Sequence, residues 1–162
     1  MTSKNLEKIA SARQGVRRTQ AEQIYNNILT HKIIPLVGHG KTTDNFELRK
    51  VGKQLFHDKF VGVFSSDSIP KLKKNTYCIA NLDPKDKPGS HWVSMVKLNN
   101  GRIGIYDSFG RKSKTILPNF KRLLKDTDLD AEQRIEETNC GQRCCAWLYV
   151  YDKYGWGMAK HI

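Results

Sequence analysis

Residues 89–110 read GSHWVSMVKLNNGRIGIYDSFG, and this stretch decides the fold. Two short runs rich in β-branched and aromatic residues, 92–98 and 103–107, flank the turn Asn99-Asn100-Gly101, whose residues tolerate positive φ. The stretch therefore predicts an antiparallel β-hairpin. A hairpin centred near Asn100 places residue 91 opposite roughly residue 109, so the residues that open the first strand lie beside those that end the second.

His91 and Asp107 both fall near the open end of this hairpin. An imidazole placed there can donate its Nδ1–H to the carboxylate, which fixes the tautomer and favours the imidazolium during a reaction. None of the other four histidines is followed by a strand that ends in aspartate. The pair is therefore the candidate base and acid of a catalytic site.

Cys140 supplies the third candidate, because it stands at the start of a predicted apolar helix, Gly141 to Tyr154. Unpaired N–H groups and the helix dipole at that end favour a thiolate, and a protonated His91 would lower the thiol pKa further. Gly141 would let a substrate carbonyl approach the backbone closely. Together, Cys140, His91 and Asp107 predict a nucleophile set for acyl transfer.

A zinc site is a less favoured interpretation of the cysteines than a catalytic thiol. Cys140, Cys144 and Cys145 form no paired C-x-x-C arrangement, and no second cluster faces them in the sequence. Cys144 and Cys145 lie a turn or more into the predicted helix, where core packing suits them better than attack. We expect no metal and no required cofactor. The polar, basic stretch 1–18 has no apolar signal region, so four free thiols in a reducing compartment, not a secreted protein, are expected.

Length and composition favour one domain over residues 1–162, with a helical part at 1–55 and a core at 56–162. Hydrophobic residues make up 38% of the chain, and no run approaches the roughly 20 apolar residues of a membrane helix. The net charge is +12, although residues 126–162 carry 7 acidic and 4 basic side chains. Solvated faces and a polyanion-binding surface are both consistent with this charge.

Periodicity predicts further elements on either side of the hairpin. A helix is expected over residues 4–30, starting at a Ser3 cap and interrupted at Gly15. A second helix is expected after a cap at Thr43 or Asp44, with these residues on its buried side: Phe46, Leu48, Val51 and Leu55. Strands are expected at 60–64 and 77–82, and a helix at 117–124.

Several motifs in one order resemble the adenovirus-type (adenain-like) cysteine proteases, which are related to the Ulp-type SUMO proteases. The resemblance covers about residues 56–154. It rests on FVGVF at 60–64 with the following Asp67, Ile69 and Pro70, CIAN at 78–81, HW at 91–92, YDSFG at 106–110, and CG at 140–141 followed by Cys144 and Cys145. It implies an α+β fold in which an antiparallel sheet packs on a central helix carrying the nucleophile, a circularly permuted papain-like core, with extra N-terminal helices.

The resemblance also implies a role for each matching residue. His91 would be the general base, Asp107 the triad acid and Cys140 the nucleophile. Gln133, seven residues before the cysteine, matches the glutamine whose side chain helps to form the oxyanion hole. Trp92, Gly89 and Gly141 are candidate substrate-binding residues.

Two departures from the family pattern limit which properties of the family can be expected of this chain. Asp107 stands where adenovirus enzymes have glutamate, whereas the Ulp branch has aspartate. No cysteine lies between Cys78 and Cys140, so the disulfide to an activating viral peptide is not carried over.

The leading hypothesis is a viral or virophage endopeptidase that processes capsid precursors during virion maturation. It would act in the virion and the host cell interior, and DNA bound to the basic surface could activate it. The alternatives are a protease that removes ubiquitin-like modifiers and a basic nucleic-acid-binding protein without activity. The sequence leaves the oligomeric state open.

Overall fold

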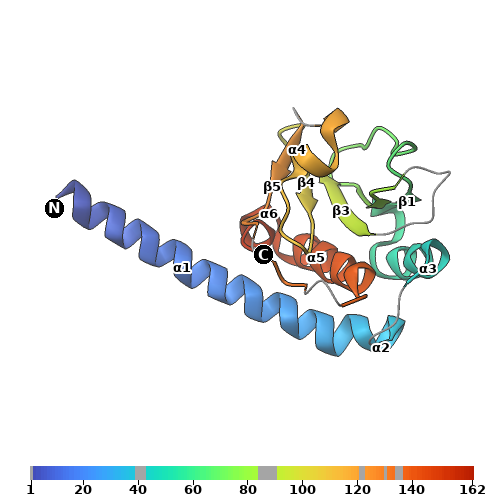
Figure 1. Cartoon of the computed structure of the whole chain (residues 1–162). Coiled ribbons are helices and arrows are strands. Elements are labelled where there is room, and N and C mark those ends of the chain that lie inside the picture. Colours follow the sequence, from blue (N-terminus) through green and yellow to red (C-terminus); the bar gives the residue numbers. More distant parts are fainter. Residues whose placement is uncertain (1, 39–42, 84–90, 121–122, 130, 134–136) are drawn as a thin grey trace.

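The computed structural model describes residues 2–38, 43–83, 91–120, 123–129, 131–133 and 137–162, with the backbone alone at 10–14 (Figure 1). Gly89 lies outside the described residues. The architecture is α+β, as the sequence predicts. One five-stranded sheet has the strand order β1 to β5 along the chain. Its strands are β1 (Phe60–Phe64), β2 (Tyr77–Asn81), β3 (Trp92–Lys97), β4 (Ile103–Tyr106) and β5 (Leu124–Asp126).

The sheet is mixed, so the expectation of an antiparallel sheet is wrong at both edges. The central pairs β2–β3 and β3–β4 are antiparallel, whereas β1–β2 and β4–β5 are parallel. Residues 65–76 connect the first parallel pair and residues 107–123 connect the second. Connections of this length can carry the chain back to the starting end of the neighbouring strand, which a tight turn cannot do.

The β3–β4 hairpin forms in the predicted register. Ser94 pairs with Tyr106 and Lys97 with Ile103, and Gly101 adopts φ +85° in the turn. Continued by three residues, this register sets position 91 opposite position 109. Each strand expected from the sequence at 60–64, 77–82, 92–98 and 103–107 is present to within one residue.

The helix expected at 117–124 is absent from the described part of that stretch, which holds other structure. A short helix α4 (Ser113–Ile116) is followed by a 3₁₀ turn (Pro118–Phe120) and then by β5. Pro118 lacks an N–H and disfavours the helical conformation at the residue before it. Leu117 accordingly lies at φ −135° and ψ 69°, outside the helical region.

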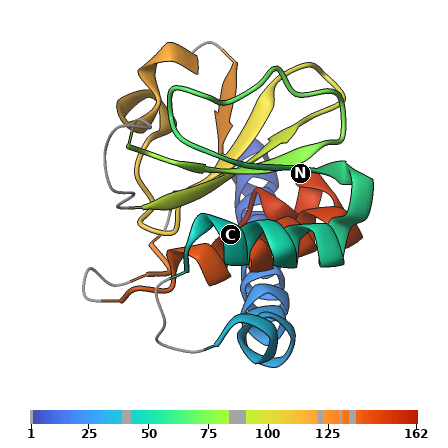
Figure 2. The same ribbon diagram turned by 90° about the vertical axis from the view of Figure 1, so that its right-hand side faces the viewer.

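The central helix α5 (Cys140–Tyr154) lies against one face of the sheet, and α1 (Ser3–Ile28) and α3 (Asn45–Phe56) lie beside it on the same side (Figures 1 and 2). One apolar cluster fills the space between these helices and the sheet, and it includes Trp147, Tyr25, Tyr106, Phe60 and Leu48. A second cluster on the opposite face is covered by side chains such as Leu72, Leu117 and Phe120. Both faces of the sheet are therefore buried.

Helix α1 is continuous through Gly15, so the predicted break there is wrong. The residue before the helix is Thr2, which makes no side-chain capping bond, and Ser3 is already helical. The first half of α1 projects from the body, whereas Ala21 and Tyr25 in its second half are fully buried (Figure 1). A π-helical turn (Leu29–Ile33) and α2 (Ile34–Val37) follow. Across the described ranges, no helix combines the length and apolarity needed to cross a bilayer.

Helix α3 begins as the sequence predicts, because the Asp44 carboxylate accepts a hydrogen bond of 2.8 Å from the Glu47 N–H. Leu48 and Val51 are buried, but Phe46 is 72% exposed, which corrects its expected place on the buried side. Two residues along a helix correspond to about 200° of rotation, so a residue two positions before Leu48 faces the opposite way. A 3₁₀ turn (His57–Lys59) then leads into β1, and α6 (Trp156–Ala159) follows α5.

The contact between α3 and β1 generates a stability prediction. A Cβ at Gly52 would overlap the Phe60 ring, whereas a Cβ at Gly15 in α1 meets nothing within 4 Å. Gly52→Ala should therefore destabilise the fold by about 1–3 kcal/mol. Gly15→Ala, the matched control, should stabilise α1 by about 0.5–1 kcal/mol. Urea unfolding of both variants measures the two effects, and equal midpoints would contradict the packing described.

Candidate active site

The structure brings His91 and Asp107 together at the open end of the hairpin. His91 immediately precedes β3 and Asp107 immediately follows β4, and both side chains are buried. The His91 ring nitrogen Nε2 lies 2.7 Å from Asp107 Oδ1. The expectation that Nδ1 would face the carboxylate is therefore wrong. Because the carboxylate occupies Nε2, the nitrogen left for another partner is Nδ1.

That partner is Cys140. The side chains of His91 and Cys140 interact closely enough for each to shift the pKa of the other, which brings the first residue of α5 to the end of the hairpin. The three residues that the sequence singled out therefore form one connected group, ordered Cys140, His91, Asp107. Such an order matches a nucleophile, a base and a group that orients the base.

The Asp107 carboxylate is held by three donors, which sequence reasoning did not find in full. Oδ1 also accepts the Phe109 N–H at 3.0 Å, and Oδ2 accepts Arg111 Nε–H at 2.8 Å. Burial alone would raise the pKa of this carboxyl. The hydrogen bonds from His91 and Arg111 outweigh burial and hold the Asp107 pKa below its ordinary value. Asp107 is therefore a carboxylate at neutral pH.

Phe109 covers the imidazole. Its ring stacks on His91 with centroids 4.5 Å apart and planes 20° from parallel, and the Arg111 guanidinium lies 5.3 Å from the Phe109 ring centroid. Nothing in the spacing of Phe109 or Arg111 distinguished them from other residues after the strand. The hairpin register, which sets position 109 opposite position 91, is the signal that could have found the first.

Trp92 packs elsewhere, although it is next to His91 in sequence. Its indole N–H donates to the Thr43 main-chain oxygen at 3.2 Å, and its ring lies against the main apolar cluster. The side chain is half-buried. Contact between Trp92 and a substrate stays a prediction, as does a role for Gly89.

Gly141 is buried, and its small size has a packing explanation. A Cβ at this position would overlap the Thr43 hydroxyl and lie 3.0 Å from the Leu48 side chain. The close approach that Gly141 permits here is between α5 and the chain around the start of α3. The reason the sequence suggested for a glycine, space for a substrate carbonyl, is therefore not needed to explain it.

The charge distribution around Cys140 favours a thiolate. Burial alone would raise the pKa of its thiol, but the hydrogen bond with His91 and the backbone N–H groups of Trp92 and Gly141 lower it below its ordinary value. For His91 the signs are reversed: burial alone would lower the imidazole pKa. The hydrogen bonds of His91 to Asp107 and Cys140 outweigh burial and raise this pKa above its ordinary value. The two shifts have opposite signs, and each favours the charged form of its group, the Cys140 thiolate and the His91 imidazolium.

The other three cysteines lie in surroundings that keep the thiol protonated. Burial raises the pKa of Cys78 and of Cys145 to about 12, and burial also raises that of Cys144 well above its ordinary value. All four cysteines are free thiols. The environments of Cys144 and Cys145 agree with the core positions expected for them.

Gln133 is buried next to Ser108. The hydroxyl of Ser108, the residue after Asp107, donates to Gln133 Oε1 at 2.6 Å, and Gln133 Nε2 donates to the Glu137 main-chain oxygen at 2.6 Å. The second bond fixes which side of the amide carries the nitrogen, because a main-chain oxygen can only accept. An amide nitrogen has two hydrogens, so it can donate a second hydrogen bond besides the one to Glu137. Its use as an oxyanion donor stays a prediction.

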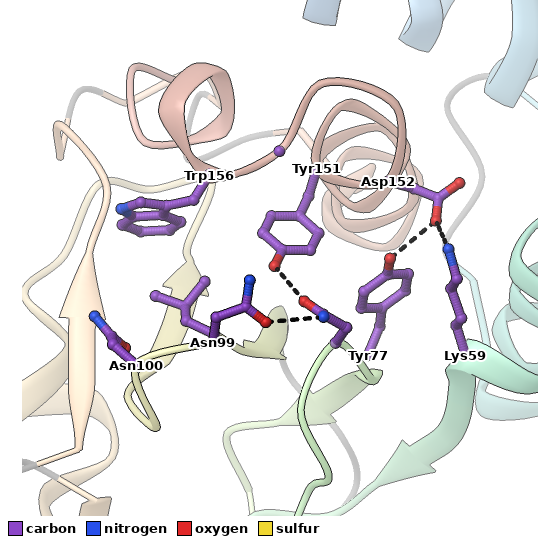
Figure 3. Close-up of a pocket in the computed structure, with 10 residues that line it drawn as sticks. Lys59, Tyr77, Asn99, Asn100, Tyr151, Asp152 and Trp156 are labelled. Atoms are coloured by element: carbon purple, nitrogen blue, oxygen red, sulfur yellow. Dashed lines mark hydrogen bonds and ion pairs between the residues drawn. The ribbon is translucent and has the colours of Figure 1, made fainter.

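A separate depression of about 560 Å³ lies at the turn end of the hairpin, away from His91 and Asp107 (Figure 3). Its polar side chains bond to one another: Tyr77 donates to Asp152 at 2.9 Å, and Tyr151 donates to Asn75 at 3.3 Å. No cysteine or histidine is among the described residues that line it. The depression therefore lacks the nucleophile and base that the Cys140 site contains.

Comparisons with known proteins add no family to this geometry. No protein-family model matches the chain, and a search of curated proteins finds no relative.

Within the described residues, no three or more His, Cys, Asp or Glu side chains are grouped so that they could hold a metal ion.

The opposed pKa shifts predict a distinctive pH profile for alkylation by iodoacetamide. Alkylation needs the thiolate, and the lowered pKa of Cys140 should let its alkylation continue to a lower pH than that of an ordinary cysteine thiol. His91→Ala removes the largest effect that lowers this pKa and keeps burial, which raises it, so the thiol pKa should rise. Each unit by which the thiol pKa rises should slow alkylation at neutral pH about tenfold.

Mass spectrometry of the modified chain measures the rate at each cysteine, and Cys78, Cys144 and Cys145 serve as internal controls that should stay unmodified. If Cys140 titrates like an ordinary thiol with or without the imidazole, the electrostatic description of the site is wrong.

Proposed function

We propose that the protein is a cysteine endopeptidase whose nucleophile is Cys140. The observation that carries this proposal is the group of Cys140, His91 and Asp107, in which the imidazole is bonded to the carboxylate at 2.7 Å and the thiol and imidazole shift each other's pKa values in opposite directions. Perturbed groups of complementary type that contact one another are typical of catalytic sites.

The proposed reaction begins with attack of the Cys140 thiolate on the carbonyl carbon of a peptide bond. The carbon–sulfur bond forms as the carbonyl electron pair moves onto oxygen. The Cys140 N–H and the second N–H of Gln133 would hold this oxyanion, and losing one such donor typically costs about 10²–10³ in rate. His91 then gives its proton to the leaving amine as the carbon–nitrogen bond breaks. Water, deprotonated by His91, releases the acyl group and restores the thiol.

Asp107, Phe109 and Arg111 fix the imidazole for both proton transfers. The carboxylate accepts His91 Nε2–H, so Nδ1 carries the proton that is exchanged with sulfur and with the substrate. Phe109 restrains the plane of the ring by stacking, and Arg111 holds the second carboxylate oxygen. Asp107 therefore stays bonded to the ring whichever way the proton moves.

The substrate class in this proposal comes from the resemblance to adenain-like proteases. Precursors of viral capsid proteins are the proposed substrates, cut in the virion or the host cell interior. The net charge of +12 supports DNA as a partner or activator on the basic surface. The aspartate at position 107, which the Ulp branch shares, supports the second candidate, a protease that removes ubiquitin-like modifiers.

Co-expression with a candidate capsid precursor tests the proposal. The intact chain should generate new termini that mass spectrometry can locate, whereas Cys140→Ala should abolish cleavage and retain the fold, because only the nucleophilic sulfur is lost. Cys145→Ala is the control, since it removes a thiol that burial keeps protonated, and it should still cleave.

A panel of fluorogenic ubiquitin-like substrates separates the two candidates. Turnover of a panel member with no precursor cleavage would favour the deconjugating protease. Precursor cleavage that survives in Cys140→Ala would refute the nucleophile, and slow labelling of Cys140 in the intact chain would favour a binding protein without activity.

A further inference from the structure

The position of Gln133 depends on a residue four places later in the chain. Its amide nitrogen donates to the main-chain oxygen of Glu137, and its amide oxygen accepts from Ser108. Its own main-chain N–H also donates to the Ser108 carbonyl at 3.0 Å. Ser108 follows directly from the hairpin, but Glu137 does not, so something else must hold Glu137 in place.

Arg143, one turn after Cys140 in α5, holds Glu137. Its Nη2 lies 3.1 Å from the Glu137 carboxylate, and its Nε–H donates to Asn139 Oδ1 at 3.1 Å. Arg143 is 9% exposed, so these bonds lie where water competes weakly for them. The guanidinium thus ties the residues before the nucleophile to the nucleophile's own helix.

The remaining guanidinium nitrogen of Arg143 bonds to helix α1. This nitrogen, Nη1, donates to the Tyr25 hydroxyl at 3.3 Å, and the Tyr25 and Tyr106 hydroxyls lie 2.7 Å apart. Tyr106 donates its single hydrogen to the Glu132 carboxylate at 3.1 Å, so Tyr25 must be the donor between the two tyrosines. The hydrogen bonds run in one direction, from Arg143 through Tyr25 and Tyr106 to Glu132.

Both tyrosines are fully buried, and burial raises the pKa of Tyr25 and of Tyr106 well above the ordinary value. They therefore stay neutral through the neutral and mildly alkaline range, and each keeps its hydroxyl hydrogen. Ionisation of the two phenols does not interrupt this chain of hydrogen bonds in that range.

Tyr25 thus connects the supports on the two sides of Gln133: Glu132 through Tyr106, and Glu137 through Arg143. We propose that Tyr25 is a positioning residue for oxyanion stabilisation, through which α1 sets the place of the Gln133 amide. This inference rests on the proposed function, and it makes helix α1, which packs against α5, part of the machinery of the site (Figures 1 and 2).

Two reactions of Cys140 separate positioning of Gln133 from reactivity of the thiol. Acylation by p-nitrophenyl acetate passes through a tetrahedral oxyanion and needs the donors that stabilise it. Alkylation by iodoacetamide displaces iodide at a saturated carbon and forms no oxyanion. The ratio of the acylation rate to the alkylation rate therefore reports oxyanion stabilisation alone, and neither reagent requires knowledge of the natural substrate.

Tyr25→Phe removes the hydroxyl and keeps the ring that packs edge-on against Tyr106. Acylation should slow roughly tenfold, a part of the 10²–10³ loss expected for removal of an oxyanion donor, which Gln133→Ala measures as the reference. Alkylation should be unchanged in both variants. Tyr151→Phe is the matched control, because it loses one hydroxyl hydrogen bond, to Asn75, at the opposite end of the sheet. Its rate ratio should equal that of the unaltered chain.

The outcomes distinguish this inference from the proposed function. Slow alkylation and no acylation in the unaltered chain would overturn the proposed function. Fast acylation that Gln133→Ala slows but Tyr25→Phe leaves unchanged would overturn the positioning role only. Equal slowing of both reactions by Tyr25→Phe, together with a lower melting temperature, would show a purely structural role and would also overturn it.

Discussion

The hydrogen bond between His91 and Asp107 is the interaction on which the rest of the site depends. It requires two residues sixteen positions apart to meet at the open end of one hairpin, and the Asn99-Asn100-Gly101 turn sets the register that makes them meet. A shift of one residue would move either side chain to the other face of the sheet. With the ring held from the Asp107 side, its other nitrogen faces the start of α5, where Cys140 lies.

Burying these groups is costly unless each is paired, and the structure pairs them through residues from distant parts of the chain. Arg111 and the Phe109 N–H donate hydrogen bonds to the Asp107 carboxylate, and Arg143 is bonded to Tyr25, Glu137 and Asn139. Residues from α1, β4 and α5 therefore meet in one polar network that includes residues close to Cys140 in the chain. The helical N-terminal part contributes to the core and to this network, which a separate appendage would not do.

Local signals in the sequence were enough for the hairpin, strands β1 to β4, the Asp44 cap and the start of α5 near Cys140, because turn chemistry, alternation and capping act within a few residues. Strand β5 was not predicted. The parallel edges of the sheet, the bonds of Arg111 and the contact between Tyr25 and Arg143 depend on how distant elements pack, and no short-range pattern encodes them. Two errors had local causes. Pro118 keeps Leu117, the first residue of the helix expected at 117–124, out of the helical conformation, and the spacing between Phe46 and Leu48 already set them on opposite sides of α3. The catalytic roles of His91, Asp107, Gln133 and Cys140 stay predictions, although the structure supplies the contacts that they need.

The central claim is that His91 is an imidazolium stabilised by the Cys140 thiolate on one side and by Asp107 on the other. A nitrogen-15 NMR titration of the histidine rings measures this directly. The account predicts that His91 stays protonated above the ordinary histidine pKa of 6.5, and that its pKa falls in Cys140→Ala, where the thiolate is missing. A His91 pKa at or below 6.5 that does not change when the sulfur is removed would contradict the account.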